Sequence, residues 1–135
     1  AWQGTGPQGI SQQEAEAFGY EAFAALWSQP RRPDALFVHT DVAARGVLMA
    51  LSRRQVRVPD ELRLTLTRNA EVGLFCPMPA SFLDVRAEAV ATALIDQLRA
   101  LCAGDPVKSR PMPVHFVDAL AQAGGSLKEW IPASA

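Results

Sequence analysis

The sequence predicts an α/β protein in which a parallel sheet is flanked by helices in three layers. Two short apolar runs, 35–38 and 62–67, have the length and side-chain pattern of strands. These runs alternate with segments of helical periodicity, an order that implies parallel pairing through right-handed crossovers. Hydrophobic residues make up 49% of the 135 residues and charged residues 20%, which is the balance of one globular domain with one core.

The first helix is predicted over residues 12–28. Ser11 is a suitable N-cap, because Glu14 follows it at the spacing of a capping box. Two prolines shortly after residue 28 end the helix. Residues 1–11 are rich in Gly, Gln and Pro, so we expect a lead-in segment or the edge of a larger protein.

A buried strand is predicted at 35–38 and a second helix at 42–54, with Asp41 as its cap. Two arginines at the end of this helix suit its C-terminus. A Val-Pro-Asp turn follows. The next segment, 62–67, alternates Leu with Arg or Thr and is predicted to be a half-buried strand.

Residues 70–83 are predicted to be irregular, because two prolines interrupt them. A third helix is expected at 84–102, with a row of Leu, Val and Ala on one side, and a last strand at 112–117. Three or four strands are few for such a sheet, so the α/β layer is expected to be incomplete. The domain is predicted to span 12–117 and to be followed by a tail, 118–135.

Composition excludes several classes of function for this segment. The net charge is −1, so no basic field is expected to bind nucleic acid. Cys76 and Cys102 stand alone and are expected to be reduced thiols of a cytoplasmic protein. No apolar stretch approaches the roughly 18 residues of a membrane span, and no export signal opens the chain.

Five features follow one another in the first half of the chain. They are a Gly-Tyr pair, a turn with prolines, an apolar strand, an acid that starts a helix containing a glycine, and a turn of the Val-Pro-acid-acid type. They stand as Gly19-Tyr20, Pro30 and Pro33, Ala35-Leu36-Phe37, Thr40-Asp41 with Gly46, and Val58-Pro59-Asp60-Glu61. In order and spacing they resemble the LacI/GalR family of transcription regulators and its periplasmic sugar-binding relatives. With weaker similarity beyond these features, the resemblance covers about residues 14–114.

The resemblance implies the C-terminal subdomain of a periplasmic-binding-protein-like fold, with a small effector in the cleft between two subdomains. It also implies that DNA is read by a dimer through an N-terminal headpiece that this chain does not contain. In the family, the helix similar to 86–102 belongs to the other subdomain. Its apolar face would therefore need another partner, either through rearranged packing or in a neighbouring chain.

Three functions follow from this resemblance. The first is the ligand-sensing and dimerisation part of a cytoplasmic LacI-type transcription regulator, acting as a homodimer. The second is a fragment of a sugar- or solute-binding protein of a transport system, since the fold is shared. The third is a degenerate domain retained only for assembly.

The resemblance also implies which residues face the effector at the carboxyl ends of the strands. The amide of the family's Asn-Asp pair corresponds to Thr40 and its carboxylate to Asp41. An aspartate after the next strand corresponds to Arg68, and a glutamine after the hinge region to Asp84. His39, which ends a strand beside Thr40, is a further candidate, although a hydrogen-bonded role at the strand end is the alternative.

Three of these four positions depart from the family pattern. Thr40 has a hydroxyl in place of an amide, and Arg68 has five donors and a fixed positive charge in place of an acceptor. These changes favour an anionic metabolite, such as a phosphate, a carboxylate or a sugar acid, over a neutral sugar. The alternative is a degenerate site, with Arg68 on a solvated loop or simply paired with Asp84.

Catalytic and metal-binding sites are not indicated. His39 and His115 are too few and too far apart in the chain to suggest a metal site. Residues 4–9 match the pattern GxGxxG but follow no strand, so the match is attributed to chance. We therefore predict no enzyme activity, no cofactor and no metal.

A separate apolar group consists of Met49 and the loop 72–78. Exposed apolar residues around two prolines suit a contact with the partner subunit of a dimer. The alternative is that the loop turns its own side chains into the core.

Overall fold

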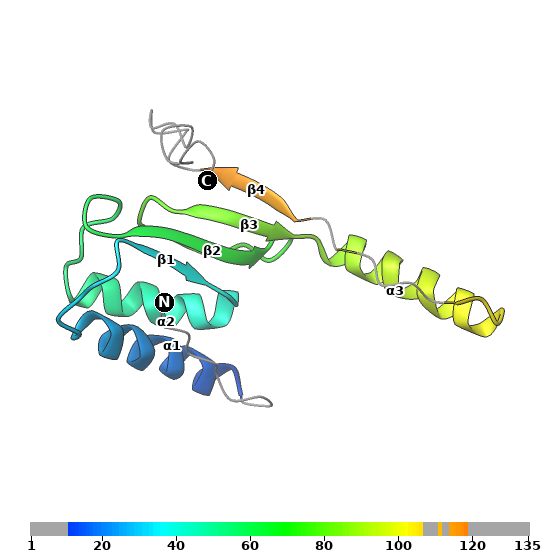
Figure 1. Ribbon diagram of the computed structural model, residues 1–135, viewed down its shortest axis with the longest axis horizontal. Coiled ribbons are helices and arrows are strands. Elements are labelled where there is room, and N and C mark those ends of the chain that lie inside the picture. The colour runs from blue at the N-terminus through cyan, green and yellow to red at the C-terminus, as the bar shows by residue number, and fades with distance from the viewer. Residues whose placement is uncertain (1–10, 107–110, 112–113, 119–135) are drawn as a thin grey trace.

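The computed structural model describes residues 11–106, 111 and 114–118. A four-stranded sheet has the order β1-β2-β3-β4 (Figure 1). β1 and β2 pair in parallel, as do β2 and β3, whereas β4 runs antiparallel to β3. The elements are α1 (Gln12–Trp27), β1 (Ala35–Val38), α2 (Asp41–Arg53), β2 (Arg63–Asn69), β3 (Ser81–Val85), α3 (Ala87–Cys102) and β4 (His115–Asp118).

The α/β class and a mostly parallel sheet are confirmed. The expectation that every strand would be parallel is wrong at β4. β3 carries the chain to the carboxyl edge of the sheet, and β4 starts at that same edge, with His115 opposite Asp84. A strand that starts there runs back towards the opposite edge, so it is antiparallel.

The prediction of irregular structure at 70–83 is wrong for its last residues, because β3 begins at Ser81. This strand is short and lacks strict alternation: Ser81 and Phe82 are both buried. Because β3 extends to Val85, the third helix begins at Ala87 and not at residue 84 as predicted. The expected last strand, 112–117, is observed at 115–118, and residues 1–10 of the lead-in and 119–135 of the tail lie outside the described residues.

The core lies between α2 and the face of the sheet that α2 covers. Val38, Leu66 and Phe82 are register partners across three strands and form one row of this face. Residues from α1, α2 and the sheet share a single buried cluster that includes Phe23, Trp27, Val38, Val47, Leu48, Leu51, Leu62, Leu64, Leu66 and Phe82.

α1 and α2 lie on the same side of the sheet and run in the same direction (Figure 1). Two glycines bring them together. A Cβ on Gly19 would overlap the backbone oxygen of Ala43, and a Cβ on Gly46 would overlap that of Glu16. Close approach of the two backbones therefore depends on the absence of a side chain at both positions.

α3 points away from the sheet (Figure 1), and none of its residues is buried within the described part of the chain. Its large apolar side chains are between 48% and 59% exposed: Leu94, Ile95, Leu98 and Leu101. Among the described helices, none is both long and apolar enough to cross a membrane. The three-layer arrangement is therefore incomplete in the described residues, as the small number of strands suggests.

Candidate ligand site at the carboxyl edge of the sheet

The carboxyl ends of β1 and β2 meet at one edge of the sheet, because the two strands are parallel. A pocket of about 450 Å³ lies between this edge and the first half of α3. Polar residues come from the strand ends: His39, Thr40, Asp41, Thr67, Arg68 and Asn69. Apolar residues come from the end of β3 and from α3: Val85, Ala87, Val90, Ala91 and Leu94.

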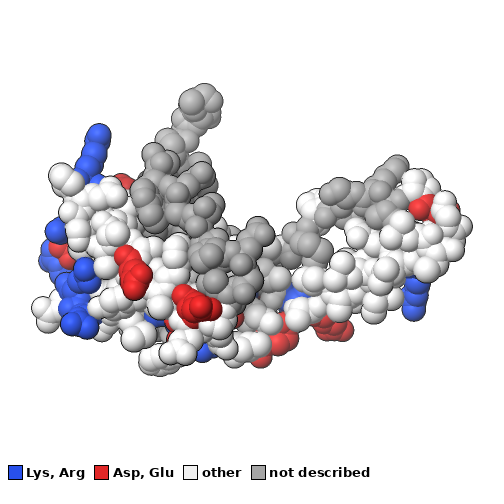
Figure 2. All heavy atoms as spheres, turned by 90° about the horizontal axis from the view of Figure 1, so that it is seen from below, with Lys and Arg blue, Asp and Glu red and all other residues white. Residues whose placement is uncertain are grey.

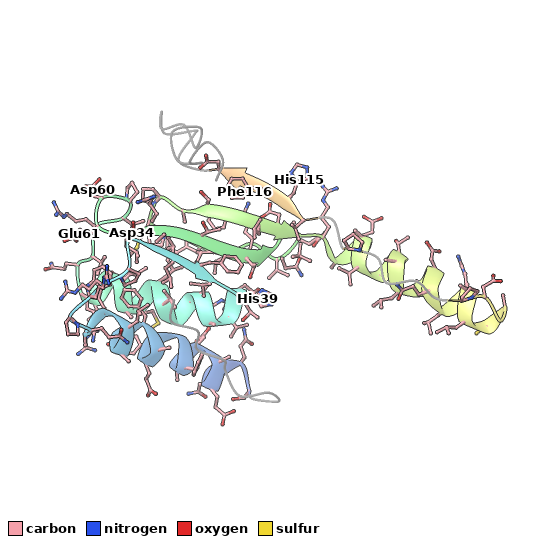
Figure 3. The ribbon with its side chains drawn as sticks, viewed as in Figure 1. Asp34, His39, Asp60, Glu61, His115 and Phe116 are labelled. Atoms are coloured by element: carbon pink, nitrogen blue, oxygen red, sulfur yellow. The ribbon has the colours of Figure 1, made fainter. Side chains whose placement is uncertain are left out.

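His39 leaves β1 at this edge (Figure 3) and contacts the next strand. Its Nδ1 lies 3.1 Å from the hydroxyl oxygen of Thr67. The buried Thr67 hydroxyl donates to the carbonyl oxygen of Val38 at 3.4 Å. With its proton used there, the Thr67 oxygen accepts a hydrogen bond from Nδ1–H. In the neutral ring this tautomer leaves Nε2 of His39 as a hydrogen-bond acceptor.

Thr40 and Asp41 line the pocket and also start α2. The prediction of Asp41 as the cap is wrong: the N-cap is Thr40, whose hydroxyl accepts a hydrogen bond from the Ala43 amide at 3.4 Å. Asp41 accepts one from the Val42 amide at 2.9 Å and places a negative charge in the first helical turn. Both side chains therefore stabilise the helix start, and their place at the pocket follows from that role.

Arg68 is held by Asp84, its register partner on β3. Its Nε donates to Oδ1 at 2.6 Å, and its Nη2 donates to Oδ2 at 3.1 Å. The guanidinium also lies 4.1 Å from the centre of the Phe82 ring. The hydrogen bonds to Asp84 raise the pKa of Arg68 above its ordinary value. The arginine charge is thus compensated within the protein, which is the pairing that the sequence left as an alternative.

The structure brings together four of the five predicted residues: His39, Thr40, Asp41 and Arg68. Asp84 does not line the pocket and instead pairs with Arg68. Sequence reasoning missed Thr67 and Asn69, which flank Arg68 at the end of β2. Their position at the end of a strand with polar residues was the available signal.

A short chain of hydrogen bonds connects β2 to the start of α3. The Asn69 side chain accepts a hydrogen bond from the Glu71 amide at 3.0 Å. The Glu71 carboxylate accepts one from the Ala87 amide at 3.1 Å, in the first turn of α3. Arg86, the N-cap residue of α3, makes no side-chain cap of its own. The carboxylate from the loop therefore takes over the capping role and links α3 to the pocket edge.

His115 lies on β4, apart from His39 (Figure 3). Among the described residues, no group of three or more His, Cys, Asp or Glu side chains is arranged to hold a metal ion. Of the cysteines, Cys76 is half-buried and Cys102 is exposed, and both are free thiols.

A second hollow of about 1170 Å³ lies between α1, α2 and the loop 72–77. Phe75 is 87% exposed and Met49 is 62% exposed. Leu74, Cys76 and Met78 instead pack against the core. Burial raises the pKa of the Cys76 thiol, which donates to the Met78 carbonyl at 3.3 Å. The interpretation that the loop turns its own side chains into the core is therefore right for Leu74, Cys76 and Met78, whereas Phe75 is exposed.

The model of the periplasmic binding protein-like domain family matches residues 3–118. The chain belongs to this family. The HTH-type transcriptional regulator GntR of Pseudomonas aeruginosa is 32% identical over 101 residues, which are 74% of this chain and 29% of that protein. The HTH-type transcriptional repressor CytR of Escherichia coli is 30% identical over 86 residues, or 60% of this chain and 25% of that one.

Solved structures show the same fold. A LacI transcriptional regulator from a Rhodococcus species has a TM-score of 0.64 at 24% identity, and the match covers 76% of this chain and 38% of that one. The chain thus spans less than half the length of each of these three proteins. This periplasmic binding protein-like chain is similar to the region of LacI-type regulators that the sequence resemblance identified.

Proposed function

We propose that this chain is the ligand-sensing and dimerisation part of a LacI-type DNA-binding transcription regulator. The observation that carries the proposal is the pocket at which polar strand ends face an apolar helix, in a fold of this family. Both sequence relatives described above are transcription regulators, which favours this function over part of a transport system. A regulator that acts on DNA in the cytoplasm also agrees with two free thiols, and no catalytic role is proposed.

The effector is proposed to be a neutral, hydroxyl-bearing molecule such as a sugar. Arg68 already has a carboxylate partner in Asp84, so its charge does not require an anionic ligand. His39 offers an acceptor at Nε2, which suits a hydroxyl donor. On the other side, Val90 and Leu94 offer an apolar surface for the C–H face of a sugar ring.

The test uses the protein as its native host produces it. Neutral monosaccharides, each paired with its sugar acid and its sugar phosphate, are screened by thermal shift, because a bound ligand raises the unfolding temperature. We expect a neutral member to bind. His39→Ala should weaken that binding about tenfold, the effect of losing one hydrogen bond in a pocket, whereas Glu21→Ala, on the exposed face of α1, should not. Binding of only the acid or the phosphate would contradict the proposed effector.

Operator binding tests the regulator itself. We expect the same protein to bind a DNA duplex from its own promoter region, with an affinity that changes when the effector is added. A protein that binds the sugar but has no affinity for DNA in either state would contradict the regulator and favour a solute-binding protein.

The proposed homodimer uses the apolar surface around Met49, Val72 and Phe75. These side chains project from α2 and the loop beside the second hollow. Phe75→Glu should convert the dimer to a monomer in sedimentation, with an unchanged circular dichroism spectrum, because a charge would be buried without a partner. Loss of the fold would assign Phe75 to the core, and an intact dimer would exclude this surface.

A further inference from the structure

Six arginines gather at the amino edge of the sheet, opposite the candidate ligand site. Figure 1 shows that α1 and α2 end where β1 and β2 begin. Blue side chains accumulate at this end of the molecule in Figure 2. We call the group the arginine edge: Arg31 and Arg32 follow α1, Arg53 and Arg54 end α2, Arg57 lies in the next turn, and Arg63 begins β2.

The arginine edge has fewer negative than positive charges. Its carboxylates are Asp34, Asp60 and Glu61, which lie at the same end of the molecule (Figure 3). Arg63 contacts Asp34 at 3.5 Å, and Arg57 contacts Glu61 at 3.5 Å. The net charge of the whole chain is only −1. The positive charge at this edge therefore results from the fold, which brings the arginines together, and not from an excess of basic residues in the chain.

The pKa of Glu61 is lowered by its hydrogen bonds with Arg57 and by the positive charges around it. Hydrogen bonds from the backbone and side chain of Arg57 lower its pKa, and the charges of Arg57 and Arg32 add to the effect. Arg32, from the segment after α1, is therefore near enough to act on a carboxylate that precedes β2. Arginines from separate segments of the chain thus share one surface.

Arg32 is also held in place. Its Nε donates to the Trp27 carbonyl at 3.0 Å, and its guanidinium lies 5.0 Å from the centre of the Trp27 ring. A fixed guanidinium loses less conformational entropy when it binds a partner. For Arg31, Arg53 and Arg54, no ion pair with another described residue is found. The preference of a helix C-terminus for cations explains Arg53 and Arg54, but not arginines from the other segments.

We propose that the arginine edge docks an acidic segment of a protein partner. The planar guanidinium binds a carboxylate through two parallel hydrogen bonds, and arginine is enriched in protein interfaces. Nucleic acid is a poorer fit, because Asp34, Asp60 and Glu61 would oppose a continuous row of phosphates. Since the ligand pocket lies at the other edge of the sheet, such a partner leaves it open.

The test measures fluorescence anisotropy of a labelled Glu-rich peptide, of the same peptide with Gln at each Glu, and of a DNA duplex. We expect the Glu peptide to bind in low salt, with weaker binding as salt is added. Arg53→Gln with Arg54→Gln should reduce its affinity about tenfold or more, because two charged contacts are lost. Arg86→Gln with Arg99→Gln removes the same charge from the α3 region and should have little effect.

Three results would overturn the proposal. The first is no binding of the Glu peptide at low salt, and the second is an equal loss in both double variants, which would indicate an unspecific charge effect. The third is duplex binding that Arg53→Gln with Arg54→Gln weakens as much as it weakens peptide binding, which would assign the edge to nucleic acid. Circular dichroism of each variant checks that the fold is retained.

Discussion

α2 and α3 share an amphipathic pattern of apolar and polar residues, but their surroundings in the structure differ. Both are amphipathic helices, of 13 and 16 residues. α2 has six buried residues and packs between α1 and the sheet, whereas α3 has none within the described part of the chain. An apolar stripe on a helix therefore indicates that a partner is required, but it does not identify the partner.

The difference lies in what surrounds each helix. α2 is fixed on one side by strands whose register brings Leu64 and Leu66 under it, and on the other by α1 at the Gly19–Gly46 contact. α3 is connected to the rest at its first turn, through Glu71. The apolar stripe of α3 therefore faces the candidate pocket at Val90 and Leu94 rather than the core.

The largest expected effect separates the two helices directly. Leu51→Ala in α2 should lower the free energy of unfolding by about 2–5 kcal/mol, because it leaves a cavity in the core. The matched change in α3, Leu98→Ala, should change it by no more than about 0.5 kcal/mol, because Leu98 is 59% exposed. Urea denaturation of this chain measures both. A large effect of Leu98→Ala would show that the α3 face is covered.

An intermediate effect on stability is expected at the close contact between α1 and α2, for which α3 has no counterpart. Gly46→Ala should destabilise the chain by about 1–3 kcal/mol, because the new methyl group forces α1 and α2 apart. The gain in helix propensity offsets only about 1 kcal/mol of the steric cost. Ser52→Ala, at an exposed position of the same helix, serves as the control. A more stable Gly46→Ala variant would contradict the close approach of the two backbones.

The smallest effect concerns the helix starts. Ser11 and Glu14 form a capping box, and the hydrogen bonds from Ser11 lower the pKa of Glu14. A lowered pKa contributes stability above the ordinary value of 4.5, and this contribution is lost as the pH falls through the lowered value. Ser11→Ala should slightly reduce the melting temperature at neutral pH and flatten its pH dependence below 4.5. If the pH dependence of the melting temperature were unchanged in this variant, the capping box would be excluded as the source of that dependence.

Local elements were largely predictable. α1, β1 and α2 lie within one residue of their predicted bounds, because capping residues and periodicity act over a few neighbouring positions. β3 was missed because a short strand after two prolines has no such pattern. For the candidate site, His39, Thr40 and Asp41 are adjacent in the chain. The Arg68–Asp84 pair needed the register of two strands before it could be established.

The sequence by itself determined the class, the family, the first two helices and four residues at the strand ends: His39, Thr40, Asp41 and Arg68. Only the tertiary structure decided that Arg68 is neutralised by Asp84, that the apolar stripe of α3 stays outside the core, and that six arginines share one edge. The physical reason is the range of the interactions. Capping and periodicity depend on residues a few positions apart, whereas ion pairs, burial and charge clusters depend on segments that the fold brings together.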